Sequence, residues 1–163
     1  MPRLTHEERA RQYLKELFNP LAFVESATSA GWGQLRDRPP EWHEGAAGYG
    51  RRFASSFAQH ATQETLQYGL STVLHEDDRY ISSGKTKFVP RLLYALESTV
   101  QSRDDDGNRQ VSYSKIGSLA GASLISRLWQ PSSTGGAGNG AVNFGVSVAF
   151  AASINVVREF LHR

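Results

Sequence analysis

The chain contains no cysteine. This absence excludes a disulfide framework, a thiolate zinc site, an iron–sulfur cluster and a cysteine nucleophile. An excess of charge of one sign is also missing, because 18 Lys and Arg residues face 16 Asp and Glu residues and the formal net charge is only +2. The basic residues are scattered and do not alternate with aromatic residues, so the sequence predicts no nucleic-acid partner.

Long hydrophobic runs are absent as well. The most apolar stretch, residues 141–157, is uncharged but is interrupted by Asn and Ser. A membrane span needs about 20 predominantly apolar residues, so we expect a buried core helix here and keep a membrane helix as the alternative. The first 18 residues are too charged for the core of a signal peptide, and we therefore expect no export signal in this chain.

Complete ligand-binding motifs are missing too. Gly84-Lys85-Thr86 resembles the end of a phosphate-binding loop, but Arg79 stands where that motif needs its first glycine. The acidic stretch around Asp104 begins like a calcium loop, yet Lys115 occupies the position of the bidentate glutamate. We therefore predict no nucleotide, no metal and no cofactor, and a charged turn at residues 104–108.

Small residues dominate what is present. Gly, Ala and Ser make up 50 of the 163 residues, and 21 of the 37 residues from Gly117 to Ser153. That stretch has a single charged residue, Arg127. Such a composition is typical of closely packed helix pairs, flexible segments or membrane helices.

Periodicity and capping signals predict an all-α fold, a bundle of five or six helices in a single domain, residues 1–163. Thr5 and Glu8 form a capping box, and Asn19-Pro20 ends one helix and starts the next. No stretch alternates with period two, so we expect little or no sheet. The expected helices are residues 6–18, 20–32, 47–75, 88–102, 112–129 and 141–161.

The two C-terminal helices carry small residues at a spacing of four, which places each set on one helix face. These helix-packing residues are Gly117 and Gly121 in one helix and Gly145, Ala149 and Ser153 in the other. We expect the two faces to pack against each other as the tightly packed centre of the bundle. A membrane-type or oligomer contact is the alternative.

The long central helix carries a polar stripe of His60, Glu64, Ser71 and His75, with Gln67 beside it. His60 and His75 are about 22 Å apart along the helix axis, so they cannot bind one ion from this helix alone. The alternative interpretation is a helix face half in solvent, with His60 and Glu64 as a weak surface pair. The ligand-binding candidates are His60, Glu64, His75, Asp77 and Asp78.

Four stretches carry a resemblance to known sequences. They are Pro39-Pro40-Glu41-Trp42, Gly48-Tyr49-Gly50-Arg51-Arg52-Phe53, Leu74 to Tyr80, and Tyr113 to Ser126. Together they resemble an uncharacterised group of bacterial proteins usually found behind export signals. The resemblance covers most of the chain and implies an envelope location. It carries no known chemistry, so it assigns no catalytic residue.

These observations favour a non-enzymatic helical bundle protein of the bacterial envelope that self-associates or contacts membrane. No Ser–His–Asp order, nucleophile elbow or paired-carboxylate spacing is recognisable in the sequence. The alternative is a small ligand- or metal-binding protein, or an enzyme, that uses the stripe of His60 and Glu64. We expect a homo-oligomer as partner, with a membrane surface as a further partner.

Overall fold

The structure, a computed structural model, describes residues 4–104 and 106–161. It is mostly helical, as predicted, with a small two-stranded sheet added. Three short 3-10 turns join the larger elements, at Pro40–Trp42, Ser126–Leu128 and Ser132–Thr134. The α-helices are α1 (His6–Leu17), α2 (Pro20–Leu35), α3 (Gly45–Leu74), α4 (Phe88–Glu97), α5 (Tyr113–Ile125) and α6 (Ala137–Leu161); the strands are β1 (Gln101–Arg103) and β2 (Arg109–Val111).

The helix starts follow the local signals in the sequence. The Thr5 hydroxyl accepts a hydrogen bond from the Glu8 backbone N–H, and the Glu8 carboxylate accepts one from the Thr5 N–H at 2.8 Å, which completes the predicted capping box. Asn19 caps α2 through a 3.0 Å hydrogen bond from the Leu21 N–H. Side-chain oxygens replace the missing partners of the first helical amides, so these ends are set locally.

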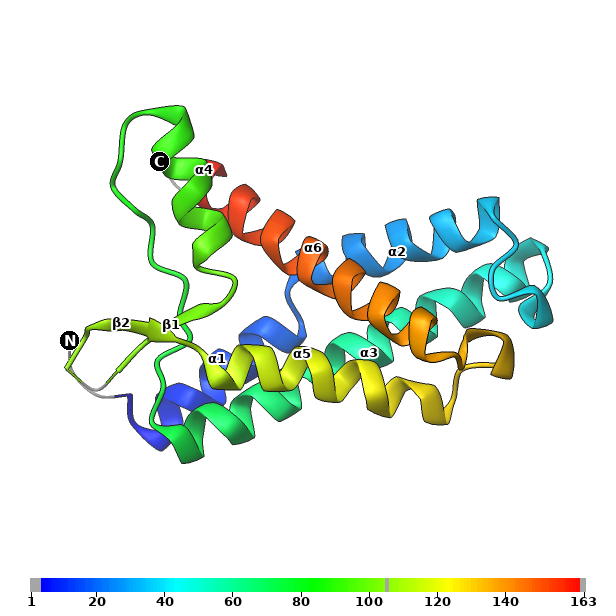
Figure 1. Ribbon diagram of the computed structural model, residues 1–163, viewed down its shortest axis with the longest axis horizontal. Coiled ribbons are helices and arrows are strands. Elements are labelled where there is room, and N and C mark those ends of the chain that lie inside the picture. The colour runs from blue at the N-terminus through cyan, green and yellow to red at the C-terminus, as the bar shows by residue number, and fades with distance from the viewer. Residues whose placement is uncertain (1–3, 105, 162–163) are drawn as a thin grey trace.

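Helix α3 is the centre of the molecule (Figure 1). The α1–α2 pair runs back along one side of it, as two aromatic contacts show. Tyr13 of α1 lies 5.2 Å from Tyr68 between ring centroids, and Phe23 of α2 stacks on Phe57 at 5.0 Å. Helix α5 packs along α3, and α6 contacts both α4 and α5.

The predicted packing of the two small-residue faces is wrong. On α5, a Cβ added at Gly121 would lie 2.8 Å from Cδ1 of Leu66, and one at Gly117 would lie 3.1 Å from Cδ1 of Leu70. The glycines of α5 therefore receive leucine side chains of α3. In this contact a large side chain from one helix fills the space above a glycine of the other helix. Two faces that carry only small residues cannot pack in this way. The tightly packed centre is consequently α3 with α5.

Helix α6 turns its own small-residue face outward. Nothing lies within 4 Å of a Cβ added at Gly145, and Ala149 and Ser153 are exposed. Only 6% of the most apolar window of this helix is buried. The expectation of a buried core helix at residues 141–157 is therefore wrong.

The charged turn at residues 104–108 closes a β-hairpin that the sequence did not predict. β1 pairs with β2 in antiparallel register, with Ser102 opposite Gln110. The Asp104 carboxylate accepts backbone N–H bonds from Asp106 and Asn108 at 3.0 and 2.8 Å, and Asp105 lies outside the described residues. Strands of three residues are too short to show an alternating pattern, which explains the omission.

Arg52 anchors the loop between α2 and α3. Its side chain is 3% exposed and donates to backbone carbonyl oxygens of Arg38, Pro39 and His43 at 2.7–3.0 Å. It also donates to the Gln34 side chain at 2.8 Å. We call this set the Arg52 cluster. Because a buried guanidinium must replace its lost water with acceptors, the cluster fixes the path of the loop.

Glu76 joins the end of α3 to the start of α5. Its carboxylate is buried and accepts hydrogen bonds from the Ser112 and Ser114 hydroxyls at 2.7 and 2.6 Å, and from the backbone N–H groups of Tyr113 and Ser114. Burial raises the pKa of Glu76, but these hydrogen bonds outweigh burial and the net pKa is lowered. This Glu76 cluster places a negative charge at the positive end of α5.

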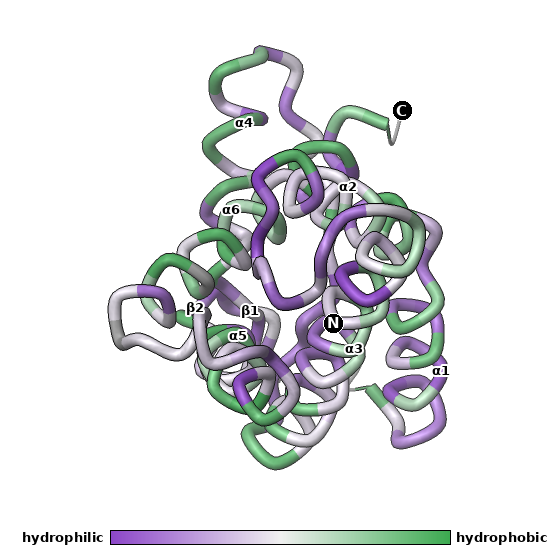
Figure 2. The backbone as a smooth tube through the Cα atoms, turned by 90° about the vertical axis from the view of Figure 1, so that its right-hand side faces the viewer, coloured by the Kyte–Doolittle hydropathy of each residue, from purple (hydrophilic) through white to green (hydrophobic). Residues whose placement is uncertain are grey.

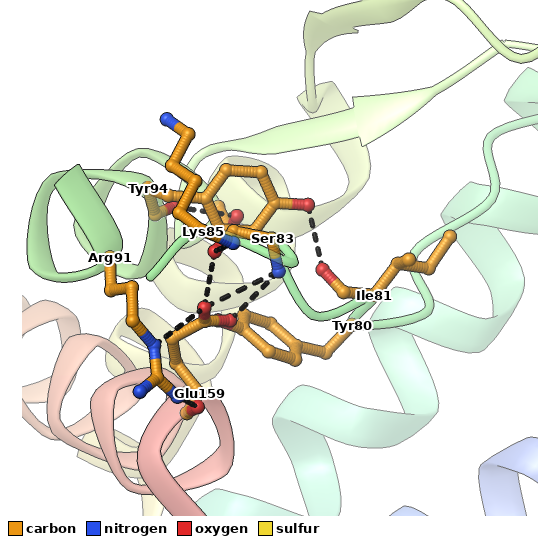
Figure 3. A network of polar contacts seen from close by, with 8 residues as sticks. Tyr80, Ile81, Ser83, Lys85, Arg91, Tyr94 and Glu159 are labelled. Atoms are coloured by element: carbon orange, nitrogen blue, oxygen red, sulfur yellow. Dashed lines mark hydrogen bonds and ion pairs between the residues drawn. The ribbon is translucent and has the colours of Figure 1, made fainter. Parts of the chain in front are cut away.

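Glu159 attaches α6 to the segment between α3 and α4 (Figure 3). Its side chain has no exposed surface, and it accepts hydrogen bonds from Tyr80 Oη at 2.7 Å and from the Ser83 N–H at 3.0 Å. Arg91 of α4 forms an ion pair with the same carboxylate at 3.4 Å. This Glu159 cluster therefore links α6 to α4 and to the segment before α4, which lie about 70 residues earlier in the chain.

The distribution of polarity is inverted relative to an ordinary core. Among the described residues, six hydrophobic side chains are buried against fourteen polar or charged ones, and Leu119 is the one large aliphatic residue in the buried set. Large apolar side chains instead lie outside, and the hydrophobic segments of α4 and α5 lie at the periphery of the end-on view in Figure 2. The interior is therefore held by hydrogen bonds and small residues more than by large apolar side chains.

Replacing Gly121 tests the packing of α5 on α3. Gly121→Leu should destabilise the protein by about 1–3 kcal/mol, because the new side chain must displace Leu66. In an isolated helix, leucine is more favourable than glycine by nearly 1 kcal/mol. A loss of stability in Gly121→Leu would therefore come from packing and not from helix propensity. Thermal unfolding followed by circular dichroism measures it, with Gly69→Leu as the control, because Gly69 is exposed on α3 and an added Cβ there meets no neighbour. A raised melting temperature for Gly121→Leu would contradict the packing.

Replacing Arg52 tests the loop anchor. Arg52→Ala should destabilise the protein by about 3 kcal/mol or more, because several buried acceptors lose their donor together. The neighbouring Arg51 is exposed, so Arg51→Ala is a matched control with an expected change within about 0.5 kcal/mol. Urea unfolding of the two variants gives both values, and equal midpoints would show that the cluster is not needed.

Candidate functional site

A cavity of about 840 Å³ runs along α3. We call it the central cavity. Residues of α1, α2, α3, α5 and α6 line it, so nearly every long element of the fold contributes a wall. Its volume lies within the roughly 300–1,000 Å³ that small-molecule sites occupy.

The polar stripe of α3, apart from His75, forms one wall of the central cavity. Its members follow each other at helical spacing and share one face of the helix. The stripe thus lines a cavity that is itself open to solvent, and apart from Ser71 its side chains are half-buried, which agrees with the interpretation as a face half in solvent. The α3 residues concerned are Ser56, Gln59, His60, Gln63, Glu64, Gln67 and Ser71.

His60 is held by α1 and not by Glu64. Its Nε2 lies 3.2 Å from the backbone carbonyl oxygen of Glu16. Burial lowers the pKa of His60, although the carbonyl and the charge of Glu16 act in the opposite direction. The ring is therefore neutral at neutral pH and donates to this carbonyl from Nε2.

Glu64 is the central acid of the cavity. Its carboxylate has no hydrogen-bond partner within residues 4–104 and 106–161. Its pKa is raised to about 8, chiefly by burial and also by the carboxylates of Glu16, Asp78 and Glu25, while Arg158 acts in the opposite direction. At neutral pH the side chain is mostly protonated and can become charged only if a cation arrives or the pH rises.

Glu25 is a second acid in the same cavity, contributed by α2. Burial raises its pKa to about 7. The sequence analysis missed this residue. A signal was available, because Glu25 is the only charged residue in α2, which is otherwise composed of apolar, small and amide side chains.

Asp78 marks one end of the cavity. Its carboxyl lies 3.0 Å from the Ser114 hydroxyl, which it shares with the closer Glu76 carboxylate, and burial raises its pKa to about 6. Lys115 lies nearby, and its ammonium donates to the backbone carbonyl oxygens of Ser98 and Gln101 at 3.0 and 2.7 Å. Burial lowers the pKa of Lys115. The Lys115 ammonium thus binds the end of α4 and the start of the β-hairpin.

Helix α6 closes the cavity through polar contacts. Arg158 forms an ion pair with Glu16 of α1, and Ser147 accepts a 3.0 Å hydrogen bond from the Gln59 amide of α3. Apolar side chains of α6, including Phe150, complete this wall. The most apolar helix of the molecule thus presents a mixed face to the cavity.

The structure separates the five predicted ligand-binding residues into two groups. His60, Glu64 and Asp78 line the central cavity. His75 and Asp77 do not. His75 is exposed and ends α3 in a left-handed conformation, with φ of 55°. Asp77 instead pairs with Arg79 at 2.6 Å.

The polar groups of the cavity are spread along its length. Within the described parts of the chain, no group of three or more His, Asp or Glu side chains is arranged to hold a metal. The cavity offers carboxyls, amides and hydroxyls spread along its length, which suits a molecule that makes several separated contacts.

Comparison with known proteins does not assign the chain to a family. No protein-family model, no curated protein and no solved structure matches the chain.

The buried acids predict a pH dependence of stability. Glu64, Glu25 and Asp78 have folded pKa values above their ordinary values, so the folded state holds more protons than the unfolded state between about pH 4.5 and 8. Stability should fall as the pH rises through this window, by at most about 1.4 kcal/mol per pH unit for each proton.

The variant Glu64→Gln should flatten this pH dependence, because glutamine is always neutral. Melting temperatures measured from pH 5 to pH 9 for wild type and variant give the two slopes. Glu97→Gln is the control, since Glu97 is 55% exposed and lies outside the cavity. Parallel slopes for wild type and Glu64→Gln would contradict the buried position of Glu64.

Proposed function

We propose that the protein is a non-enzymatic helical protein of the bacterial envelope whose apolar outer surface lies against lipid. The envelope location rests on the resemblance of four sequence stretches to exported bacterial proteins. The membrane contact rests on the surface. The observation that carries it is the inverted distribution of polarity, with large apolar side chains outside and polar side chains inside.

The exposed apolar residues are too numerous for a surface that faces water alone. Trp32 is 58% exposed, Phe88 64% and Leu128 85%. Each such side chain costs free energy in water, at about 25 cal/mol per Å² of apolar surface. Monomers that face only water rarely expose large apolar patches, and such patches mark contacts with lipid or protein.

Helix α6 is the element best suited to lipid. Residues 138–161 form the one helix, within the described residues, that is long and apolar enough to cross a membrane. Val157 and Leu161 are exposed on it and do not line the central cavity. Its charged residues Arg158 and Glu159 are instead paired inside the protein with Glu16 and Arg91.

Self-association is the second candidate, and the outward small-residue face of α6 favours it. Gly145, Ala149 and Ser153 lie one turn apart with nothing covering Gly145. Faces with this spacing allow two helices to approach closely inside lipid. A second copy of α6 could therefore cover the face that this chain leaves open.

Flotation with lipid vesicles tests the membrane contact. Purified protein mixed with neutral phosphatidylcholine vesicles, without detergent, should rise with the vesicles in a density gradient. Val157→Asp should weaken this partition by about tenfold or more, because Val157 is exposed outside the cavity and a charge on the lipid-facing side of a helix is costly. Gln110→Asp is the control, because Gln110 is an exposed polar residue of β2 and its replacement removes no apolar surface.

Mass measurement by light scattering separates the two candidates. A wild-type protein that stays below the vesicles as an 18.0 kDa monomer would contradict both. Self-association would be favoured over lipid contact by two results together. The protein would form an oligomer without detergent that Gly145→Leu dissociates, and it would not float with the vesicles.

A further inference from the structure

We propose that α4 lies on a membrane surface that carries anionic lipids, with Lys85 and Lys87 against the lipid phosphates. This inference rests on the membrane contact proposed above and deepens it, because it names the helix that meets the bilayer surface and the charge of the lipid. The apolar side chains that would enter the bilayer are Val89, Leu93 and Leu96, which we call the α4 face.

Helix α4 turns its apolar side away from the protein. The three residues of the α4 face follow each other at a spacing of four and three residues, which places them on one side of the helix. They are between 43% and 60% exposed. The opposite side is buried, because Tyr94 packs inside and its hydroxyl donates to the backbone carbonyl oxygen of Ile81 at 2.6 Å. The α4 face is therefore left without a partner in this chain.

The exposed apolar surface continues from α4 onto the end of α6. The ring of Phe88, at the start of α4, lies 5.2 Å from the ring of Phe160 between centroids. Phe88 is exposed, and so is Leu161, the residue that follows Phe160. Figure 1 shows α4 beside the C-terminal end of α6, at one end of the molecule. An apolar surface that extends over two neighbouring helices marks a contact site.

The charge of this region is positive. Residues 80–103 include four basic residues and a single acidic one, Glu97. Glu97 pairs with Arg109 at 3.8 Å. The acid that α6 brings to the region, Glu159, is buried and pairs with Arg91. Both carboxylates beside α4 are therefore neutralised inside the protein.

The two lysines before α4 keep their charge for the outside. Lys87 is exposed and directly precedes Phe88. The Lys85 ammonium points away from the Glu159 carboxylate and lies 5.5 Å from the centroid of the Tyr94 ring (Figure 3). Within the described residues, neither lysine takes part in an ion pair. Lysines beside an exposed apolar helix face are the arrangement by which interfacial helices bind anionic lipid.

Length and charge together favour a lipid surface as the occupant of the α4 face. With ten residues, α4 is far shorter than the roughly 20 residues that a membrane span needs, so it would lie on the bilayer and not cross it. The α4 region of a second copy carries the same positive charge and would repel the lysines. An anionic leaflet instead offers them phosphates together with an apolar interior.

Flotation with two kinds of vesicle separates this inference from the membrane contact itself. At low salt, the partition coefficient should be about tenfold or more higher for an equal mixture of phosphatidylcholine and phosphatidylglycerol than for phosphatidylcholine alone. Added salt should reduce this preference, because mobile ions screen the lysines. Equal partition into the two vesicles would overturn the inference and leave the membrane contact standing. No flotation with either vesicle would overturn both.

Replacing the two lysines tests their role. Lys85→Gln combined with Lys87→Gln should lower partition into the mixed vesicles by about tenfold and leave partition into neutral vesicles unchanged. Lys15→Gln combined with Arg51→Gln is the matched control, since it removes the same net charge from exposed positions on α1 and α3. The control should keep the preference for mixed vesicles. An equal loss in both double variants would show that binding follows net charge alone, which would overturn the proposal.

A spin label tests the α4 face without removing a charge. Because the chain has no cysteine, Leu93→Cys accepts a single nitroxide. With mixed vesicles, this label should become shielded from a water-soluble nickel complex and accessible to dissolved oxygen. A label introduced through Glu44→Cys, at the exposed start of α3 and at the opposite end of the molecule from α4, should stay accessible to nickel (Figure 1).

The label remains decisive if the lysine variant fails to fold. Equal access of the nickel complex to position 93 with and without vesicles would overturn the proposal. A label at position 93 that is already shielded in the vesicle-free protein would show that a second copy covers the α4 face, and this would overturn it as well.

Discussion

A buried charge is stable in a protein only when hydrogen bonds replace the water that it has lost. Arg52, Glu76 and Glu159 satisfy this requirement with groups from several segments each. Their hydrogen bonds are directional, so each charge fixes the position of every segment that supplies a partner. In a chain that buries few large aliphatic side chains, these clusters set the geometry that the helices and the central cavity then share.

The four familiar sequence stretches gain a physical explanation from two of these clusters. The stretches that begin at Pro39 and Gly48 meet around Arg52, and those that begin at Leu74 and Tyr113 meet around Glu76. A Cβ added at Gly48 would lie 2.1 Å from the His43 carbonyl oxygen, so this glycine is required by close backbone approach. The stretches therefore build the scaffold, which agrees with their lack of recognisable chemistry.

The sequence predicted what local chemistry determines. Helix starts at Thr5 and Asn19 follow from capping side chains, and the polar stripe of α3 follows from helical spacing. It did not predict which faces meet, because the partner of the α5 glycines is a pair of leucines some 50 residues earlier. The acids of the cavity were only partly predicted, since Glu25 and Glu64 come together through tertiary packing.

The clusters differ in how far apart along the chain their members lie, and this sets an order in which they can form. Arg52 reaches back at most 18 residues to its partner Gln34, whereas Ser83 and Glu159 are 76 residues apart. Closing the longer loop costs about 1.3 kcal/mol more in chain entropy. During synthesis, the Arg52 cluster can close while α4, α5 and α6 are still unmade, so the N-terminal half offers a preformed surface to the C-terminal half as it emerges from the ribosome.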